Sequence, residues 1–199
     1  MIKAVVLDWG GVMCPGGSPH SFRKLLAASL GIDEERARTL LHLGVVDLLC
    51  GRITEDEYWL HLEQAQGKSI PEAQRNVWLT WDDLKPDPRM LQLVSDLKSR
   101  GLKLGLLSNA VPNTRNVMLQ HHAGNGFNAV VISCDNHCAK PDEQAYLLIA
   151  QKLDVEPSEC QYIDDQQRML DPATKLGMRT ILAKTPSQTI ADINHQLLN

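Results

Sequence analysis

An apolar run near the amino terminus ends in a single acid that is followed by two glycines. Residues 5–7 are Val-Val-Leu, and the next four are Asp8, Trp9, Gly10 and Gly11. A short apolar run bounded by turn residues suits a buried parallel strand, and open α/β sheets bind their ligands at the carboxyl ends of such strands. The sequence therefore predicts that Asp8 lies at the mouth of a cleft, although an ordinary turn would have the same pattern.

Three later segments place polar side chains where an apolar run or a helix boundary is expected. Residues 104–107 are apolar and precede Ser108 and Asn109, whose hydroxyl and amide can hold phosphate oxygens. Lys140 precedes a proline, which keeps Lys140 extended and can itself start a helix. Asp164 and Asp165 end another short apolar run. Two adjacent carboxylates repel each other unless a cation lies between them, so this pair suggests a metal site.

Taken singly, these segments also suit a helix cap, a solvated charge and a turn. Taken together and in this order, they describe a phosphoryl-transfer site. That chemistry needs a carboxylate nucleophile, a hydroxyl, a lysine and an acidic pair for a hard cation, because most of the catalysis is positioning and charge neutralisation.

The spacing of apolar residues divides the chain into a core and a helical insert. From Ser18 to about Trp81 the apolar residues have helical spacing, and Thr54-x-x-Glu57 and Ser69-x-x-Glu72 resemble capping boxes. After Pro86, helical and strand patterns alternate, which indicates a parallel sheet with right-handed crossovers. We therefore predict an α/β protein with a Rossmann-like, three-layer parallel-sheet core (residues 1–14 and 85–199) and an inserted all-helical cap (residues 15–84).

Composition excludes several classes of function. The net charge of −4 gives no sign of a nucleic-acid footprint, and no apolar stretch approaches the roughly 20 residues that span a bilayer. The chain starts directly with a strand pattern and has no signal-peptide pattern, so a cytoplasmic protein is expected. The sequence gives no indication of oligomeric state.

Five cysteines at irregular spacing favour free thiols over a disulfide framework. Cys134, His137 and Cys138 lie within five residues and offer two thiolates and an imidazole to a zinc ion, but no fourth ligand has a recognisable spacing.

At this point the chain resembles the haloacid dehalogenase superfamily of hydrolases over nearly its whole length. The segments that carry the resemblance are Asp-x-Gly-Gly-Val at the start, Lys140-Pro141-Asp142 to Tyr146, and Tyr162-Ile163-Asp164-Asp165. Within this superfamily, the Gly51-Arg52-Ile53-Thr54 stretch and the Asp-x-Gly-Gly-Val start look most like the sugar-phosphatase branch with a small helical cap. The amino-terminal phosphatase domains of soluble epoxide hydrolases share that branch.

The resemblance implies roles for individual residues. Asp8 would attack the phosphoryl group and form an aspartyl-phosphate. Ser108 and Lys140 would bind the phosphate and assist catalysis, and Asn109 would help to orient the substrate, a small phosphorylated metabolite. A further set would hold Mg²⁺: the carboxylates of Asp8, Asp164 and Asp165 and the carbonyl of Gly10.

The chain departs from the family pattern at two positions. Gly10 stands where most phosphatases of the family carry a second aspartate, which protonates the leaving oxygen and later activates water, and Met169 stands where an asparagine is expected. Losing a positioned acid and base typically costs about 10² to 10⁴ in rate.

Three functions therefore stay open. The first is a Mg²⁺-dependent phosphatase for a substrate with a good leaving group, such as an anomeric sugar phosphate or an acyl phosphate. The others are a catalytically weak or inactive binding or regulatory protein, and a hydrolase of the phosphonatase or dehalogenase type.

Overall fold

Five parallel strands form one sheet, in the order β3-β2-β1-β4-β5. The computed structural model describes residues 1–15, 19–75, 82 and 84–198. The strands are β1 (Ala4–Leu7), β2 (Lys103–Ser108), β3 (Ala129–Ile132), β4 (Cys160–Asp164) and β5 (Arg179–Leu182). The first strand is central, and after β3 the chain crosses to its other side to form β4. Such a reversal of strand order makes a crevice at the carboxyl ends of the strands.

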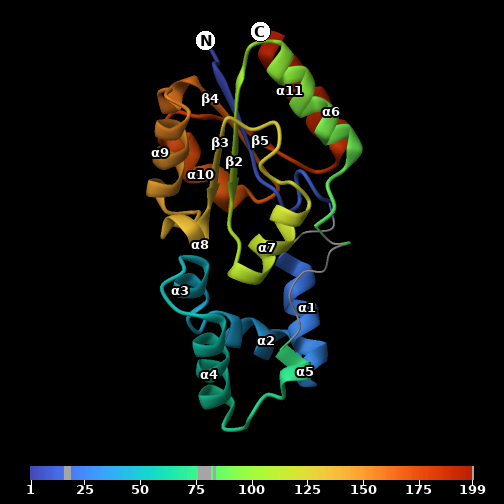
Figure 1. The fold of residues 1–199 in the computed structure, drawn as a ribbon, viewed down its shortest axis with the longest axis vertical. Helices are drawn as coiled ribbons and strands as arrows, with labels where there is room; N and C mark the ends of the chain where they lie inside the picture. Colours follow the sequence, from blue (N-terminus) through green and yellow to red (C-terminus); the bar gives the residue numbers. More distant parts are fainter. Residues whose placement is uncertain (16–18, 76–81, 83, 199) are drawn as a thin grey trace.

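Helices cover both faces of the sheet, as the predicted three-layer core requires (Figure 1). Val5 and Leu7 face a cluster of buried residues that includes the apolar side of α6 (Pro88–Ser99) and Ile193 of α11 (Pro186–Leu198). Ala4 and Val6 face the opposite cluster, which includes α9 (Glu143–Lys152) and α10 (Gln167–Lys175). All four residues of β1 are fully buried, so its continuous apolar run belongs to a strand covered on both sides.

The helices between β1 and α6 have a hydrophobic cluster of their own. They are α1 (Pro19–Leu30), α2 (Glu34–Leu41), α3 (Val45–Leu49), α4 (Glu55–Gln66) and α5 (Glu72–Arg75). Leu26, Leu40, Tyr58 and Leu62 are fully or almost fully buried in this cluster, which also receives Val111 from the core side. Figure 1 shows these helices beyond the carboxyl ends of the strands, where a cover for a site would lie. We call residues 15–84 the insert.

The two ends of the insert are tied together beside the sheet. The Asp87 amide donates to the Met13 carbonyl at 2.8 Å, and the Trp9 indole donates to the Leu84 carbonyl at 3.2 Å. Trp9 directly follows Asp8, so the chain enters and leaves the insert next to the predicted nucleophile.

The insert also contacts loops of the core that surround the carboxyl ends of the strands. The Glu55 carboxylate accepts from the amide of Asn113, at the start of α7 (Pro112–Gln120), at 2.8 Å. His137, which follows α8 (Ser133–Asn136), lies with Nδ1 3.0 Å from the Cys50 carbonyl. A Cβ at Gly51 would lie 2.4 Å from the Cys134 carbonyl oxygen, so only glycine allows this approach.

Most predicted elements are confirmed, and the differences have local causes. Thr54 and Glu57 form the predicted capping box of α4, whereas Ser69 does not cap a helix, because its hydroxyl donates to Glu63. Pro141 does not start a helix: its bond to Lys140 is cis, and α9 begins at Glu143.

Other sequence expectations concern helices, cysteines and the membrane. The structure adds α7 between β2 and β3, where no individual helix is named from the sequence, and a short 3-10 helix spans Pro157–Glu159. All five cysteines are free, as predicted. Within the described ranges, no helix combines the length and the apolar character that crossing a bilayer requires.

Candidate active site

Asp8 lies at the end of the central strand, immediately beside the end of β4. Its amide donates to the Ile163 carbonyl at 3.0 Å, and its own Oδ1 accepts from the Trp9 amide at 2.7 Å. Asp8 is 7% exposed. The backbone thus fixes the direction of a carboxylate that is almost completely enclosed.

The second glycine after Asp8 makes room for another acid. Gly11 has a left-handed backbone, with φ of +76°, and a Cβ at this position would lie 2.4 Å from both Cγ and Oδ2 of Asp165. Real Cβ atoms do not approach other atoms this closely, so only glycine allows Asp165 to lie against the turn. Gly10 does not have a positive φ. Its backbone conformation is therefore open to other residues, whereas that of Gly11 favours glycine.

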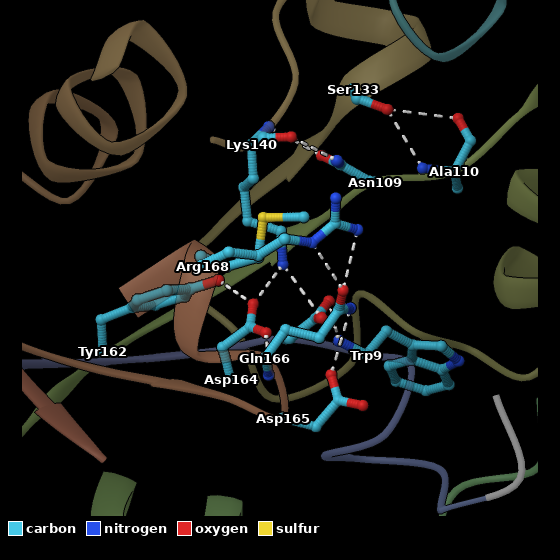
Figure 2. A network of polar contacts seen from close by, with 12 residues as sticks. Trp9, Asn109, Ala110, Ser133, Lys140, Tyr162, Asp164, Asp165, Gln166 and Arg168 are labelled. Carbon is cyan, nitrogen blue, oxygen red and sulfur yellow. Dashed lines mark hydrogen bonds and ion pairs between the residues drawn. The ribbon is translucent and has the colours of Figure 1, made fainter. Parts of the chain in front are cut away.

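Lys140 lies between two of the acids. Its Nζ is 3.0 Å from Asp8 Oδ2 and 2.8 Å from Asp164 Oδ2, and the residue is 4% exposed. The lysine predicted as a lone cation outside a helix is therefore a buried bridge between the ends of β1 and β4. Figure 2 shows the side chain extending from its loop into the carboxylate cluster.

Asn109 holds the backbone of this lysine. Its Nδ2 donates to the Lys140 carbonyl at 2.8 Å, and its Oδ1 accepts from the Lys140 amide at 2.9 Å. This reciprocal pair joins the end of β2 to the loop before α9. The predicted contact between Asn109 and a substrate stays a prediction, because the observed bonds assign the amide to positioning Lys140.

Asp164 and Asp165 have different surroundings although they are adjacent. Asp164 is fully buried, and besides Lys140 it accepts from the Tyr162 hydroxyl and, at 2.9 Å, from the Gln166 amide. Asp165 is only partly buried and receives a long bond of 3.4 Å from Gln166 Nε2. Asp164 is thus committed to internal partners, whereas Asp165 retains oxygens for another ligand.

The described residues bring one set of potential metal ligands together: Asp8, Asp164 and Asp165, each with an oxygen within 4.8 Å of the others. Three carboxylates here face one ammonium group. Burial, followed by the charges of Asp164 and Asp165, raises the pKa of Asp8 to about 7, against the lowering effect of Lys140. Burial and the Asp164 charge also raise the pKa of Asp165. The donor set and its excess negative charge suit a hard divalent cation.

Lys140 keeps its proton in this cluster. Burial lowers its pKa, but attraction to Asp8 and Asp164 and hydrogen bonds to both outweigh burial, so the pKa lies above its ordinary value. Ser108, the last residue of β2, is buried at the same edge of the sheet. The structure therefore gathers the predicted side chains at the carboxyl ends of β1, β2 and β4.

Comparison with known proteins identifies the family. A family model described as haloacid dehalogenase-like hydrolase matches residues 2–176, which is most of the chain. The chain belongs to the haloacid dehalogenase-like hydrolases.

Three named proteins are similar to this chain in amino-acid sequence. The acyl-CoA dehydrogenase family member 10 of Mus musculus is 29% identical over 207 residues, covering 96% of this chain and 19% of that protein. Bifunctional epoxide hydrolase 2 of Sus scrofa is 30% identical over 109 residues (52% of this chain, 20% of that protein). Phosphatase MT3486 of Mycobacterium tuberculosis is 34% identical over 106 residues (52% and 48%). The chain thus spans about a fifth of the length of the first two.

A solved structure confirms the haloacid dehalogenase-like fold. It is an enzyme of this family from Bacteroides thetaiotaomicron, in complex with magnesium and inorganic phosphate, and it is 20% identical with a TM-score of 0.73. The match covers 92% of this chain and 95% of that chain. At this identity the similarity establishes the fold alone.

The sequence analysis missed several residues that complete the site of this haloacid dehalogenase-like chain. Tyr162 precedes Asp164 by two residues on β4, and the two-residue period of a strand is the signal that places both on one face. Gln166 and Arg168 follow the acids, and Figure 2 shows both at the cluster. No spacing rule indicates that the side-chain amide of Gln166 contacts Asp165 and Arg168.

Two other sequence hypotheses concern residues away from the carboxylates. Within the described ranges, the side chains close enough to share a metal ion are those of Asp8, Asp164 and Asp165. The cysteines and the histidine at 134–138 are not part of such a group.

The three tryptophans Trp59, Trp78 and Trp81 are candidates for lining a substrate pocket. Trp59 is buried in the cluster of the insert and borders a hollow beside Glu55 and Asn113. Trp78 and Trp81 lie outside the described residues.

Proposed function

We propose that this chain is a Mg²⁺-dependent phosphatase of a small phosphorylated metabolite that acts through an aspartyl-phosphate on Asp8. The observation that carries the proposal is the buried Asp8 carboxylate, which contacts Lys140 at 3.0 Å and lies within 4.8 Å of two further acids. A fixed nucleophile, a buried cation and a cluster of acids are the parts that phosphoryl transfer requires. Phosphatase-named relatives and the magnesium and phosphate complex of a family member support it.

The carboxylates fit a magnesium ion. Asp8 and Asp165 would be its principal ligands, with the Gly10 carbonyl, and Asp164 would contribute directly or through water. Bound Mg²⁺ would neutralise charge on the phosphoryl oxygens and on the crowded acids. Because Asp164 already accepts from Lys140, Tyr162 and Gln166, Asp165 has more capacity to bind the ion.

The protein groups carry out the reaction in two steps. An Asp8 oxygen attacks phosphorus, the bond from phosphorus to the leaving oxygen breaks, and its electron pair goes to that oxygen. Water then attacks phosphorus of the aspartyl-phosphate and the bond from phosphorus to the Asp8 oxygen breaks. The protons of the water stay with the released phosphate, and the Asp8 carboxylate is restored. Lys140, whose Nζ lies 3.0 Å from Asp8 Oδ2, neutralises the charge that develops on the phosphoryl group. The Ser108 hydroxyl donates to a phosphate oxygen.

Gly10 has no side chain to protonate the leaving oxygen, and this limits the substrates. Alkoxide leaving groups need a proton in the transition state, whereas an anomeric sugar oxygen, an acyl oxygen or a phenolate leaves with less assistance. We therefore propose that the substrate carries such a good leaving group.

The same glycine favours a second candidate function, a protein that binds phosphate esters and Mg²⁺ without turning them over. Release of phosphate from acetyl phosphate, glucose 1-phosphate, 4-nitrophenyl phosphate and glycerol 2-phosphate, with Mg²⁺ and with EDTA, separates the candidates. We expect Mg²⁺-dependent turnover of the first three and little of the last.

Asp8→Asn is the matched control, because an amide of equal size cannot act as the nucleophile. Turnover that persists in purified Asp8→Asn would exclude the aspartyl-phosphate route. If the wild type binds Mg²⁺ but releases phosphate from no substrate, the binding function becomes the better conclusion.

A further inference from the structure

Arg168 is an exposed cation beside the carboxylate cluster that the proposed reaction does not use. It lies in the first turn of α10, directly after β4 and the acids. Its Nε and Nη2 donate to Gln166 Oε1 at 3.1 and 2.9 Å. Figure 2 shows the guanidinium directed at this amide and lying near the Lys140 side chain.

Helix stability does not explain a positive charge at this place. The amino-terminal end of a helix carries a partial positive charge, so a cation in the first turn is electrostatically unfavourable. The first turn of α10 contains no acid, and none of the ion pairs observed between described residues involves Arg168. The arginine therefore gains no compensating carboxylate from the part of the chain that the structure describes.

The side-chain amide of Gln166 contacts both Arg168 and Asp165. Its Oε1 accepts from the guanidinium, while its Nε2 points to Asp165 Oδ1 at 3.4 Å. The neutral amide thus contacts a cation through its oxygen and an anion through its nitrogen. As a result, Asp165 stays available as a metal ligand, and the guanidinium stays available for an external anion.

The guanidinium retains donors suited to a planar anion. Arginine has five N–H groups in a fixed fork, and Gln166 occupies one on Nε and one on Nη2. The others match the two oxygens of a carboxylate or phosphate, which arginine binds with two parallel hydrogen bonds.

We propose that Arg168 binds a second anionic group of the substrate, so that the chain selects phosphorylated metabolites that also carry a carboxylate or a further phosphate. The inference rests on the proposed function for the position of the first phosphoryl group. It adds a specificity-determining residue, and Gln166 is the residue that positions it.

Binding of phosphonates tests the proposal without requiring turnover. Phosphonoacetate, 3-phosphonopropionate and 4-phosphonobutyrate are each compared with the alkylphosphonate of equal length, by calorimetry on the whole chain with Mg²⁺. A bidentate, charge-assisted contact predicts that at least one carboxylated ligand binds wild type about 10- to 100-fold more tightly than its partner. Arg168→Gln should reduce that ratio to nearly one, and Arg168→Lys should keep part of it.

Lys175→Gln is the matched control, because it removes an exposed cation from the other end of the same helix. The control should keep the wild-type ratio. The proposal is wrong if the wild type shows no preference at any length. It is also wrong if Arg168→Gln weakens both members of a pair equally, since Arg168 would then serve the phosphoryl group or the fold. An Arg168-dependent preference in a protein without turnover would support this site while refuting the phosphatase.

Discussion

Replacing Gly11 by alanine should disable the metal site, whereas the equivalent change at Gly10 should not carry the cost of a left-handed backbone. The added Cβ would lie 2.4 Å from Cγ and Oδ2 of Asp165 and 2.9 Å from its Cβ. Asp165 has a short side chain, so relief requires the whole residue to move. A left-handed backbone costs a residue other than glycine about 1–2 kcal/mol, in addition to the displacement of Asp165. Gly10 lacks the positive φ, so Gly10→Ala avoids that cost.

The displacement of Asp165 and the backbone cost set the expected losses of Mg²⁺ affinity and of stability in Gly11→Ala. Loss of the best-placed metal ligand should weaken Mg²⁺ binding at least tenfold, which is about 1.4 kcal/mol. The melting temperature of the metal-free protein should fall by several degrees, since 1 kcal/mol shifts a chain of this size by about 2–4 °C. Mg²⁺ titration by calorimetry and thermal unfolding with EDTA measure the two effects in Gly11→Ala and Gly10→Ala.

A double-mutant cycle isolates the contact between Gly11 and Asp165. In an Asp165→Ala background the two atoms at 2.4 Å are absent, so Gly11→Ala should cost less stability there than in the wild type. Equal Mg²⁺ affinity of Gly11→Ala and Gly10→Ala, together with additive stability changes, would refute the close approach as the reason for this glycine.

Three further predictions concern the same cluster. Asp165→Asn should lose Mg²⁺ affinity and keep its fold. Asp164→Asn should lower the free energy of unfolding by about 3 kcal/mol, because it leaves Lys140 partly unpaired. Denaturant titrations in which Asp165→Asn is the less stable of the two variants would contradict the assigned partners. The pKa of Asp8 in the folded protein, about 7, lies above its unfolded value. The metal-free protein should therefore lose stability as pH rises from about 4 to 7. Because Mg²⁺ binds the ionised carboxylate, Mg²⁺ affinity should increase up to tenfold per pH unit below pH 7. Calorimetry at pH 6 and pH 8 checks the latter, and pH-independent affinity would show that Asp8 is not a ligand. Gly10→Asp should increase turnover of alkyl phosphates by supplying an acid, with little gain for aryl phosphates; a uniform gain would argue against the leaving-group limit.

The ends of the buried strands could be predicted from the sequence because their apolar runs are continuous. Asp8, Ser108 and Asp164 each follow such a run, and parallel strands bring their carboxyl ends to one edge of a sheet. The order of the segments indicated that Lys140 belongs to the site, and the family resemblance added its role. The contact of Lys140 with the acids depends on a loop conformation that no periodicity encodes.

Contacts between side chains could not be predicted in the same way. The reciprocal bonds of Asn109 with the Lys140 backbone join residues 31 positions apart. Ser69 had the sequence signature of a cap, but Glu63 of the preceding helix competes for its hydroxyl. The helix α7 begins with a proline at its first position, a start signal that an interrupted apolar pattern obscured.

The hydrogen bond between Asp87 and Met13 has an evolutionary consequence. It closes the insert into a loop whose two ends are neighbours, so residues between them can be lengthened, shortened or exchanged without shifting the register of β1 against β2 and β4. The groups proposed to react lie on those strands and on the loops that follow them. The described contacts of the insert with the core include polar groups at residues 50–55 and the packing of its cluster against Val111. Selection can therefore change the insert while the strand ends that carry the acidic cluster are inherited unchanged.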